Sequence, residues 1–177
     1  PEGLYFGNGV GVGFDAIVGF EAARMTRIHG AASYTLGALK TIITYPAAPF
    51  VEFTADGNRE NLRPALISIM NGRRMGGSFF MAPDASIDDG LLDWCHTDQG
   101  PRLRLLSALA AYAKGRHRER HDTSAGRASR YTIQAASGSL AVHTDGETVC
   151  EAGKSIDIEV VPGALKLVGR SRGADRR

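Results

Sequence analysis

A chain of 177 residues is long enough for one domain with a hydrophobic core, or for one domain with an appendage. Its hydrophobic share of 43% and its charged share of 23% are those of an ordinary globular protein. The net charge of +2 is too small to indicate a nucleic-acid-binding protein. No apolar run approaches the roughly 18 residues that a membrane-spanning helix needs.

Positive charge is concentrated between Pro101 and Arg130, where eight basic residues face two acidic ones. Such a cluster favours an anionic membrane surface or a phosphorylated ligand. The alternative is a solvated helix end followed by a loop, and the sequence leaves both open. We expect residues 1–169 to form the domain and the arginine-rich residues 170–177 to be a disordered basic tail.

The first part of the chain is predicted to form a short strand and two helices. The strand covers residues 4–6 and runs into a glycine-rich turn. Apolar residues at helical spacing predict one helix over residues 16–28 and another over residues 32–44, which Pro46 ends.

Strands dominate the remainder. Residues 50–62 alternate around an Asp56-Gly57 turn and predict a hairpin. Residues 65–70 are apolar on both faces and predict a buried strand, and another strand is predicted over residues 92–96.

A third helix is predicted over residues 101–114, with a proline in its first turn and Gly115 at its end. After it, residues 131–168 contain turn pairs every eight to twelve residues, which predicts four or five short strands. The expected fold is therefore α+β, mainly an antiparallel β-sandwich with two or three helices on one side.

Neither the cysteines nor the histidines have the spacing of a metal site. Cys95 and Cys150 are single cysteines in strand-like runs, so we expect a buried free thiol in each case rather than a disulfide or metal ligands, which fits a cytoplasmic protein. His117 and His121 are four residues apart but lack a third ligand, and they are interpreted as a surface pair.

The glycines from Gly9 to Gly13 suggest a loop that binds a nucleotide phosphate. Gly11-x-Gly13-x-x-Ala16 fits a permissive form of the dinucleotide fingerprint. The βαβ unit that should follow is missing, because a second helix comes next instead of a strand. The simpler interpretation is that glycine lets the backbone turn tightly and pack closely.

An ordered series of short motifs runs through the chain, each of them ordinary turn chemistry on its own. In chain order they are Asn8, Gly13-Phe14-Asp15-Ala16, Asn71, Gly76-Gly77, Ala82-Pro83, Asp89-Gly90-Leu91-Leu92-Asp93, Gly115-Arg116-His117 and Asp145-Gly146-Glu147. Their order and spacing resemble the C-terminal, lipid-recognising half of the diacylglycerol kinase and sphingosine kinase family. The resemblance covers residues 4–168, nearly the whole chain.

By its residues alone, Asp145-Gly146 is a hairpin turn and Glu147 faces solvent. The resemblance implies that Glu147 lies at a cleft between two domains and is catalytic. There it would accept the proton of the acceptor hydroxyl or help to hold Mg²⁺ during phosphoryl transfer. The resemblance also marks a set of candidate substrate-binding residues, namely Asn8, Asp15, Asn71, Gly76 and Gly77.

Asp88, Asp89 and Asp93 form a second acidic cluster, whose oxygen atoms suit a hard divalent cation. The resemblance implies a structural Mg²⁺ here, bound by the side chain of Asp89 and by the backbone carbonyls of Ser86 and Leu91. The alternative is a plain acidic turn.

A lipid substrate would need an apolar cleft for its acyl chain. The candidate lining residues, which as a set are also compatible with a simple core, are Phe14, Ile17, Phe20, Leu36, Leu39 and Ile43.

The resemblance places the ATP site in an N-terminal domain with a Gly-Gly-Asp-Gly-Thr loop, a motif that these 177 residues lack. The chain begins at Pro1 rather than Met, which suggests a fragment of a longer protein. Because one carboxylate and a lipid pocket cannot bind and activate ATP alone, we expect the chain to be the lipid-acceptor half of an ATP-dependent lipid kinase, inactive when isolated. The acceptor would be a hydroxyl of diacylglycerol, a sphingoid base or a related lipid.

The main alternative is a non-catalytic module that binds lipids or membranes. For either function the expected location is the cytoplasm, with peripheral contact to an anionic membrane. The sequence leaves open whether the chain forms a homodimer.

Overall fold

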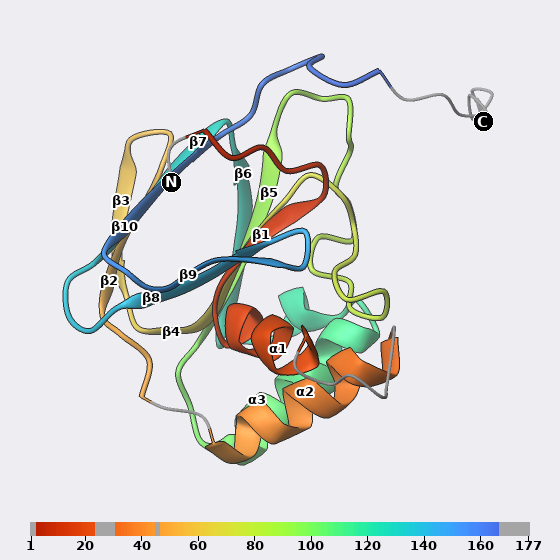
Figure 1. Cartoon of the computed structure of the whole chain (residues 1–177), viewed down its shortest axis with the longest axis vertical. Helices are drawn as coiled ribbons and strands as arrows, with labels where there is room; N and C mark the ends of the chain where they lie inside the picture. Colours follow the sequence, from red (N-terminus) through yellow and green to blue (C-terminus); the bar gives the residue numbers. More distant parts are fainter. Residues whose placement is uncertain (1–2, 24–30, 45–46, 167–177) are drawn as a thin grey trace.

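The computed structural model describes residues 3–23, 31–44 and 47–166. They form two β-sheets packed face to face, with helices against the outer face of one sheet (Figure 1). Every strand pair in these residues is antiparallel. The predicted α+β fold, with a dominant antiparallel sandwich, is therefore confirmed.

The larger sheet has six strands in the spatial order β6-β5-β4-β1-β8-β9. Its strands are β1 (Gly9–Gly13), β4 (Pro64–Met70), β5 (Leu92–Asp98), β6 (Thr123–Ala128), β8 (Leu140–Thr144) and β9 (Glu147–Gly153). The smaller sheet has four strands in the order β10-β7-β2-β3. These are β2 (Val51–Ala55), β3 (Asn58–Leu62), β7 (Arg130–Ala135) and β10 (Ser155–Glu159).

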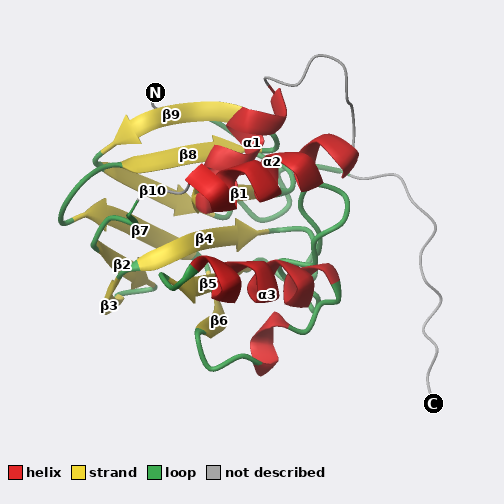
Figure 2. Cartoon of the chain, turned by 90° about the horizontal axis from the view of Figure 1, so that it is seen from below, coloured by secondary structure: helices red, strands yellow, loops and turns green. Residues whose placement is uncertain are grey.

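The helices lie together on one side of the larger sheet, as predicted (Figure 2). They are α1 (Phe14–Ala23), α2 (Ala31–Thr44) and α3 (Arg102–Ala113), and a short 3-10 helix, η1 (His117–Glu119), follows α3. In the part of the chain that the structure describes, no helix is long and apolar enough to span a membrane.

The start of the chain differs from the expected strand and turn. Residues 4–6 lie outside any strand, and the glycine run itself is strand β1. Val10 and Val12 fill the space between the sheets, while Gly11 faces α1. Because β1 pairs with β4 on one edge and β8 on the other, its backbone groups are engaged in the sheet. The run is therefore not a phosphate-binding loop.

The helix boundaries are close to the predicted ones. Helix α1 begins at Phe14, two residues before the predicted start, and the predicted residues 24–28 lie outside the described residues. Helix α3 begins directly after Pro101, whose fixed φ suits the start of a helix.

The strand predicted to be buried, β4, connects the two cores of the domain. Ile67 and Ile69 face the smaller sheet, whereas Leu66 and Met70 face the helices. Because successive side chains of a strand point to opposite faces, this alternation buries all seven residues of β4. The larger sheet is therefore the middle layer of a three-layer domain.

Two expectations about single residues have different outcomes. Cys95 and Cys150 are free thiols; Cys95 is buried as predicted, whereas Cys150 is only half-buried. The prediction of a histidine surface pair is wrong, because His117 is fully buried and stacks on Tyr112, with ring centroids 4.3 Å apart. Only His121 of that pair is exposed.

Candidate functional site

The turn between β8 and β9 is anchored to the segment that leads into β1. Asp145 and Gly146 form this turn with φ values of 48° and 91°. The Asp145 carboxylate accepts the backbone N–H groups of Gly7 at 2.6 Å, Asn8 at 3.0 Å and Gly9 at 2.8 Å. Hydrogen bonds to a charged carboxylate are shorter and stronger than those between neutral groups, so these three bonds fix the position of the hairpin.

Two asparagines complete this corner. The side-chain amide of Asn8 donates to the carbonyl of Arg74 at 3.0 Å, and that of Asn71 donates to the carbonyl of Gly7 at 2.9 Å. The backbone N–H of Asn71 also donates to the carbonyl of Asn8, at 2.8 Å. The structure therefore brings the predicted residues Asn8 and Asn71 together with the turn that carries Glu147. We call this group (Gly7–Gly9, Asn71, Arg74 and Asp145–Glu147) the anchored corner.

Glu147 is the first residue of β9 and lies opposite Thr144 of β8. Its side chain is exposed and has no hydrogen-bond or ion-pair partner among residues 3–23, 31–44 and 47–166. Its backbone, in contrast, belongs to the hairpin that Asp145 holds. An exposed carboxylate on a fixed hairpin is available to a group presented from outside the domain.

Asp15 lies in a different place, in the first turn of α1 above the larger sheet. Its carboxylate accepts the hydroxyl of Ser68 at 2.8 Å and lies 3.8 Å from Nε2 of the buried His143. Both partners sit beside Gly11, since strand pairing aligns Gly11 with Ser68 and with His143. Sequence reasoning missed Ser68 and His143, and the only signal for Ser68 was a hydroxyl within an apolar strand.

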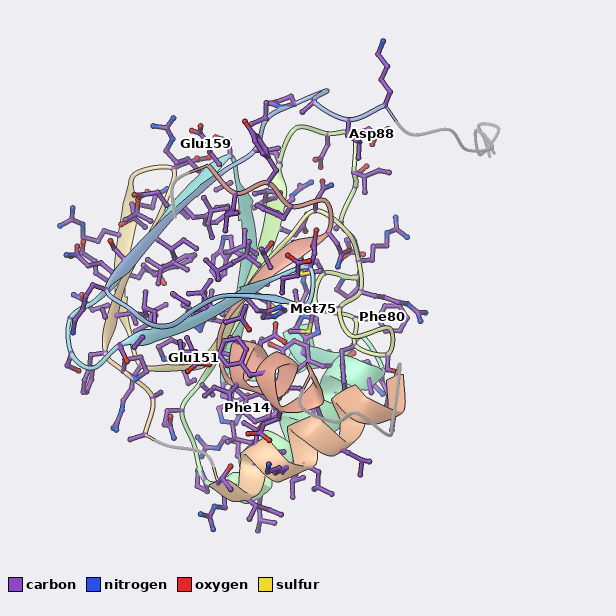
Figure 3. All side chains as sticks on the ribbon, in the orientation of Figure 1. Phe14, Met75, Phe80, Asp88, Glu151 and Glu159 are labelled. Carbon is purple, nitrogen blue, oxygen red and sulfur yellow. The ribbon has the colours of Figure 1, made fainter. Side chains whose placement is uncertain are left out.

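Gly76 and Gly77 form a turn that begins two residues after Arg74 in the sequence. Their φ values are 58° and 74°, a region that favours glycine. Backbone bonds between Met75 and Phe79, at 2.9 and 3.2 Å, close the turn. Figure 3 shows Met75 and Phe80 on the side of the molecule where the helices and this loop meet.

The predicted metal turn contains oxygen donors, but its carboxylate already has partners. Asp89 accepts the backbone N–H of Leu91 at 3.0 Å and lies 3.6 Å from the guanidinium of Arg127. The hydroxyl of Ser86 donates to Asp88 at 2.5 Å. In the described residues no three His, Cys, Asp or Glu side chains are placed to hold a metal. A cation here would therefore depend on backbone carbonyls, the chemistry that Mg²⁺ and Ca²⁺ accept.

Asp93 lies in a different environment from Asp88 and Asp89 of this turn. Its carboxyl is buried, and this burial raises its pKa, while the charges of Arg118 and Arg127 oppose the rise. Arg118 lies 3.6 Å from Asp93 and 2.8 Å from Asp84, so it bridges the two carboxylates. Asp93 thus has a structural partner of its own.

The basic segment from Pro101 to Arg130 is largely neutralised by ion pairs. Within it, Arg116 pairs with Glu119 and Arg120 pairs with Asp122, each at distances as short as 2.7 to 2.8 Å. Arg118, Arg127 and Arg130 have carboxylate neighbours as well. The arginine run therefore does not form one free cationic surface.

Three of the six predicted lining residues are exposed in the structure. Phe14 is buried in the core between the sheet and the helices, but Leu36, Leu39 and Ile43 are exposed on α2. The exposure of the three α2 residues therefore contradicts the prediction that all six residues line an enclosed lipid cleft.

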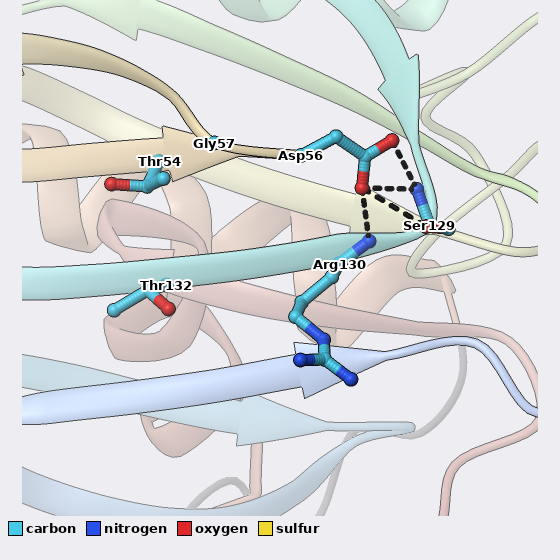
Figure 4. Close-up of a pocket in the computed structure, with 6 residues that line it drawn as sticks. All are labelled: Thr54, Asp56, Gly57, Ser129, Arg130 and Thr132. Atoms are coloured by element: carbon cyan, nitrogen blue, oxygen red, sulfur yellow. Dashed lines mark hydrogen bonds between the residues drawn. The ribbon is translucent and has the colours of Figure 1, made fainter.

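Two hollows among the described residues lie elsewhere, at the smaller sheet. The first, of about 310 Å³, is lined by Thr54, Asp56, Gly57, Ser129, Arg130 and Thr132 (Figure 4). The Asp56 carboxylate accepts the backbone N–H groups of Ser129 at 3.1 Å and Arg130 at 2.9 Å, and the bonds from Ser129 are the main reason that its pKa is lowered. Asp56 therefore stabilises a turn rather than facing a ligand. The second hollow, of about 340 Å³, opens beside Trp94.

Residues 8–169 match the family described as the YegS C-terminal NAD kinase beta sandwich-like domain. The chain belongs to this family. Its curated relatives include the diacylglycerol kinases of Mycobacterium tuberculosis strains CDC 1551 / Oshkosh and ATCC 25618 / H37Rv. Each is 30% identical over 170 residues, which are 96% of this YegS-type chain and 53% of the relative.

Solved structures share the fold of this YegS-type domain. A proposed diacylglycerol kinase from Bacillus anthracis str. Sterne superposes with a TM-score of 0.63 at 23% identity, over 92% of this chain and 51% of that one. A second diacylglycerol kinase structure from the same organism gives 0.57 at 18%, over 92% and 48%. At these identities the likeness concerns the fold alone.

The expected membership of the diacylglycerol kinase-like lipid kinases, as their C-terminal domain, is thus confirmed. The YegS-type chain spans about half the length of the curated relatives it matches.

Proposed function

We propose that this YegS-type domain is the lipid-acceptor half of an ATP-dependent lipid kinase. The acceptor would be a hydroxyl of diacylglycerol, a sphingoid base or a related lipid. The observation that carries the proposal is Glu147, an exposed carboxylate without a partner in the described part of the chain, on a hairpin held by Asp145. The two diacylglycerol kinases among the relatives support the reaction class.

The role of Glu147 is that of a general base beside the acceptor hydroxyl. It would accept the hydroxyl proton while the lipid oxygen bonds to the γ-phosphorus of ATP and the bond from that phosphorus to ADP breaks. Phosphoryl transfer needs mainly positioning and charge neutralisation, and Mg²⁺ bound with ATP supplies much of the latter. The fixed backbone of the anchored corner provides the positioning.

ATP itself would be bound mainly by another domain. The 177 residues contain no Gly-Gly-Asp-Gly-Thr loop, and the glycine run that could have replaced it is strand β1. The isolated chain should therefore transfer no label from ATP to diacylglycerol. Joining it to an ATP-binding domain of the family should restore transfer, and label transfer by the isolated chain would contradict this part of the proposal.

Replacing one carboxylate oxygen tests the catalytic role directly. In a kinase that contains this domain, Glu147→Gln should lower kcat by about 100- to 10,000-fold, the usual contribution of a general base. Binding of the protein to lipid vesicles should not change. Glu151→Gln is the matched control, because Glu151 is another exposed glutamate on β9. If both variants turn over like the parent protein, Glu147 is not catalytic, and a non-catalytic lipid-binding module becomes the better description.

We also propose a structural Mg²⁺ at the turn of Ser86, Asp89 and Leu91. The support is the oxygen chemistry of these donors, and the guanidinium of Arg127 near Asp89 would have to move aside. Millimolar Mg²⁺ should raise the melting temperature of the domain, and Asp89→Asn should abolish the rise. Asp88→Asn is the control, and an equal Mg²⁺ response in both variants would contradict the site.

A further inference from the structure

Helices α2 and α3 expose large apolar side chains on their outer surface. The exposed positions of α2 recur at helical spacing and those of α3 lie one turn apart, and they reach 61% exposure at Ile43 and 80% at Leu103. The full set is Leu36, Leu39 and Ile43 on α2, with Leu103 and Leu106 on α3. The opposite sides of the same helices supply Ile42, Leu105 and Tyr112 to the core. Each helix therefore carries apolar side chains both on the side that packs into the core and on the side that faces solvent.

The charge of these two helices has one sign. Neither α2 nor α3 contains Asp or Glu. Lys40 lies on α2, Arg102 and Arg104 lie on α3, and Lys114 follows directly after α3. Lys40 pairs with Glu21 of α1, and Arg104 lies 4.0 Å from Asp122. Arg102 and Lys114 are exposed and have no acidic partner within the described residues. These two cations therefore stand at the two ends of α3.

The two exposed surfaces belong to one side of the molecule. Figure 2 shows α2 and α3 both on the side facing the viewer, Figure 1 shows them at the bottom, and the two helices contact each other. The side chain of Gln99 accepts the backbone N–H of Ala48 at 2.9 Å, which ties the segment before α3 to the segment after α2. We call Leu36, Leu39, Ile43, Leu103 and Leu106, with Arg102 and Lys114, the α2–α3 face.

We propose that the α2–α3 face docks onto an anionic lipid bilayer. A bilayer fits both observations. Protruding leucine and isoleucine side chains enter the boundary between headgroups and acyl chains, and the exposed cations Arg102 and Lys114 attract anionic headgroups. The absence of carboxylates on both helices removes the repulsion that such a surface would otherwise exert. The proposal rests on the proposed function, since a kinase that phosphorylates a membrane lipid must reach it at the bilayer.

Vesicle sedimentation with the whole kinase tests the proposal without any need for turnover. The probes are vesicles of phosphatidylcholine alone and of phosphatidylcholine with phosphatidylglycerol. We expect binding to the second kind only, weakening steeply with salt. The triple variant Leu39→Gln, Ile43→Gln, Leu103→Gln should bind at least about tenfold more weakly. Arg102→Gln with Lys114→Gln should weaken binding by about fivefold for each charge removed.

A matched triple variant controls for the loss of exposed apolar surface in general. Ile87, Val161 and Leu165 are similarly exposed. Figure 3 shows Asp88 and Glu159 at the end of the molecule opposite the helices; Ile87 is next to Asp88 in sequence, and Val161 comes two residues after Glu159. Replacing these three with Gln should leave vesicle binding unchanged. Because all of the substituted side chains are exposed, both triple variants should keep the parent melting temperature.

Activity measurements distinguish membrane docking by the α2–α3 face from contact of this face with another part of the protein or with a second copy. Docking predicts that the α2–α3 variant loses activity on diacylglycerol in vesicles but keeps activity on a short-chain, water-soluble diacylglycerol. If the variant binds vesicles like the parent protein, or loses both activities equally, the face contacts another part of the protein or a second copy, and the proposal is wrong. Vesicle binding that depends on the face in a protein without any kinase activity would contradict the proposed function and leave the docking surface intact.

Discussion

The carboxylate of Asp145 accepts the backbone N–H of Asn8 at 3.0 Å, although 137 positions separate the two residues in sequence. The same carboxylate holds Gly7 and Gly9, and the carbonyl of Asn8 accepts the N–H of Asn71. The Asp145 side chain thus joins the β8–β9 hairpin to the segment before β1, and the carbonyl of Asn8 joins that segment to the one after β4. The position of Glu147 depends on this junction.

Removing the Asp145 carboxylate should therefore destabilise the domain more than its exposure suggests. Asp145→Ala leaves three N–H groups without their charged acceptor and puts alanine at a φ of 48°. We expect the free energy of unfolding to fall by about 2 kcal/mol, and by about 1 kcal/mol for Asp145→Asn, which tolerates this φ. Urea denaturation measures both. Asp157→Ala, which removes a single exposed bond to Thr132, should cost less than either, and an equal cost would contradict the anchoring role.

Gly11 should not tolerate even a methyl group. A Cβ at this position would collide with the side chains of His143 and Asp15, both of which are held between α1 and the sheet. Gly11→Ala should therefore cost about 1 to 3 kcal/mol, the usual range for overpacking. At Gly7 the nearest atom to an added Cβ is 3.8 Å away, so Gly7→Ala should be nearly neutral. Equal thermal stability of the two variants would show that the helix layer adjusts freely.

Apolar spacing and turn residues predict those helices and strands in which these sequence signals are strong. Strand β4, the β2–β3 hairpin and helices α2 and α3 all follow from apolar spacing or from turn residues. Strand β1 was missed because three of its five residues are glycine, which carries no side chain to show alternation. Only its pairing with β4 and β8 makes it a strand, and pairing partners so far apart cannot be read from local sequence.

The same limit applies to the candidate site. Asn8, Asn71 and the Asp145–Glu147 turn could be marked as a set only by family resemblance, since each is ordinary turn chemistry on its own. The contact of Asp15 with Ser68 and His143 needed the strand register, which places both partners beside Gly11. Burial of His117 was also hidden, because its flanking arginines indicate a surface. The catalytic role of Glu147 and the cation at Asp89 stay predictions.

His117 should make the domain sensitive to acid. Burial, with the nearby charge of Arg118, lowers the pKa of His117 from 6.5 to about 4. Because the unfolded chain binds the proton more tightly, this histidine favours folding above pH 6.5, and that contribution is lost as pH falls toward 4. The loss should reach roughly 2 to 3 kcal/mol. His117→Phe keeps a ring against Tyr112 and should flatten the fall in stability between pH 7 and pH 4.

His121→Gln is the control for that measurement, because His121 is exposed whereas His117 is buried. It should follow the parent pH profile. If His117→Phe loses stability with acid as steeply as the parent does, another buried group carries the effect, and His96 is the first candidate because burial also lowers its pKa.

The two free cysteines should differ sharply in reactivity. Cys95 is buried beneath α3, where its thiol lies 3.7 Å from the hydroxyl of Tyr112, and burial raises its pKa to about 12. Since the thiolate is the reactive form, Cys95 should not react with an aromatic disulfide reagent in the native protein at pH 8. The half-buried Cys150 should react alone, and both should react after denaturation. Cys150→Ser should then leave no reactive thiol in the native protein, and a fast native reaction in that variant would show that the α3 layer opens readily over the sheet.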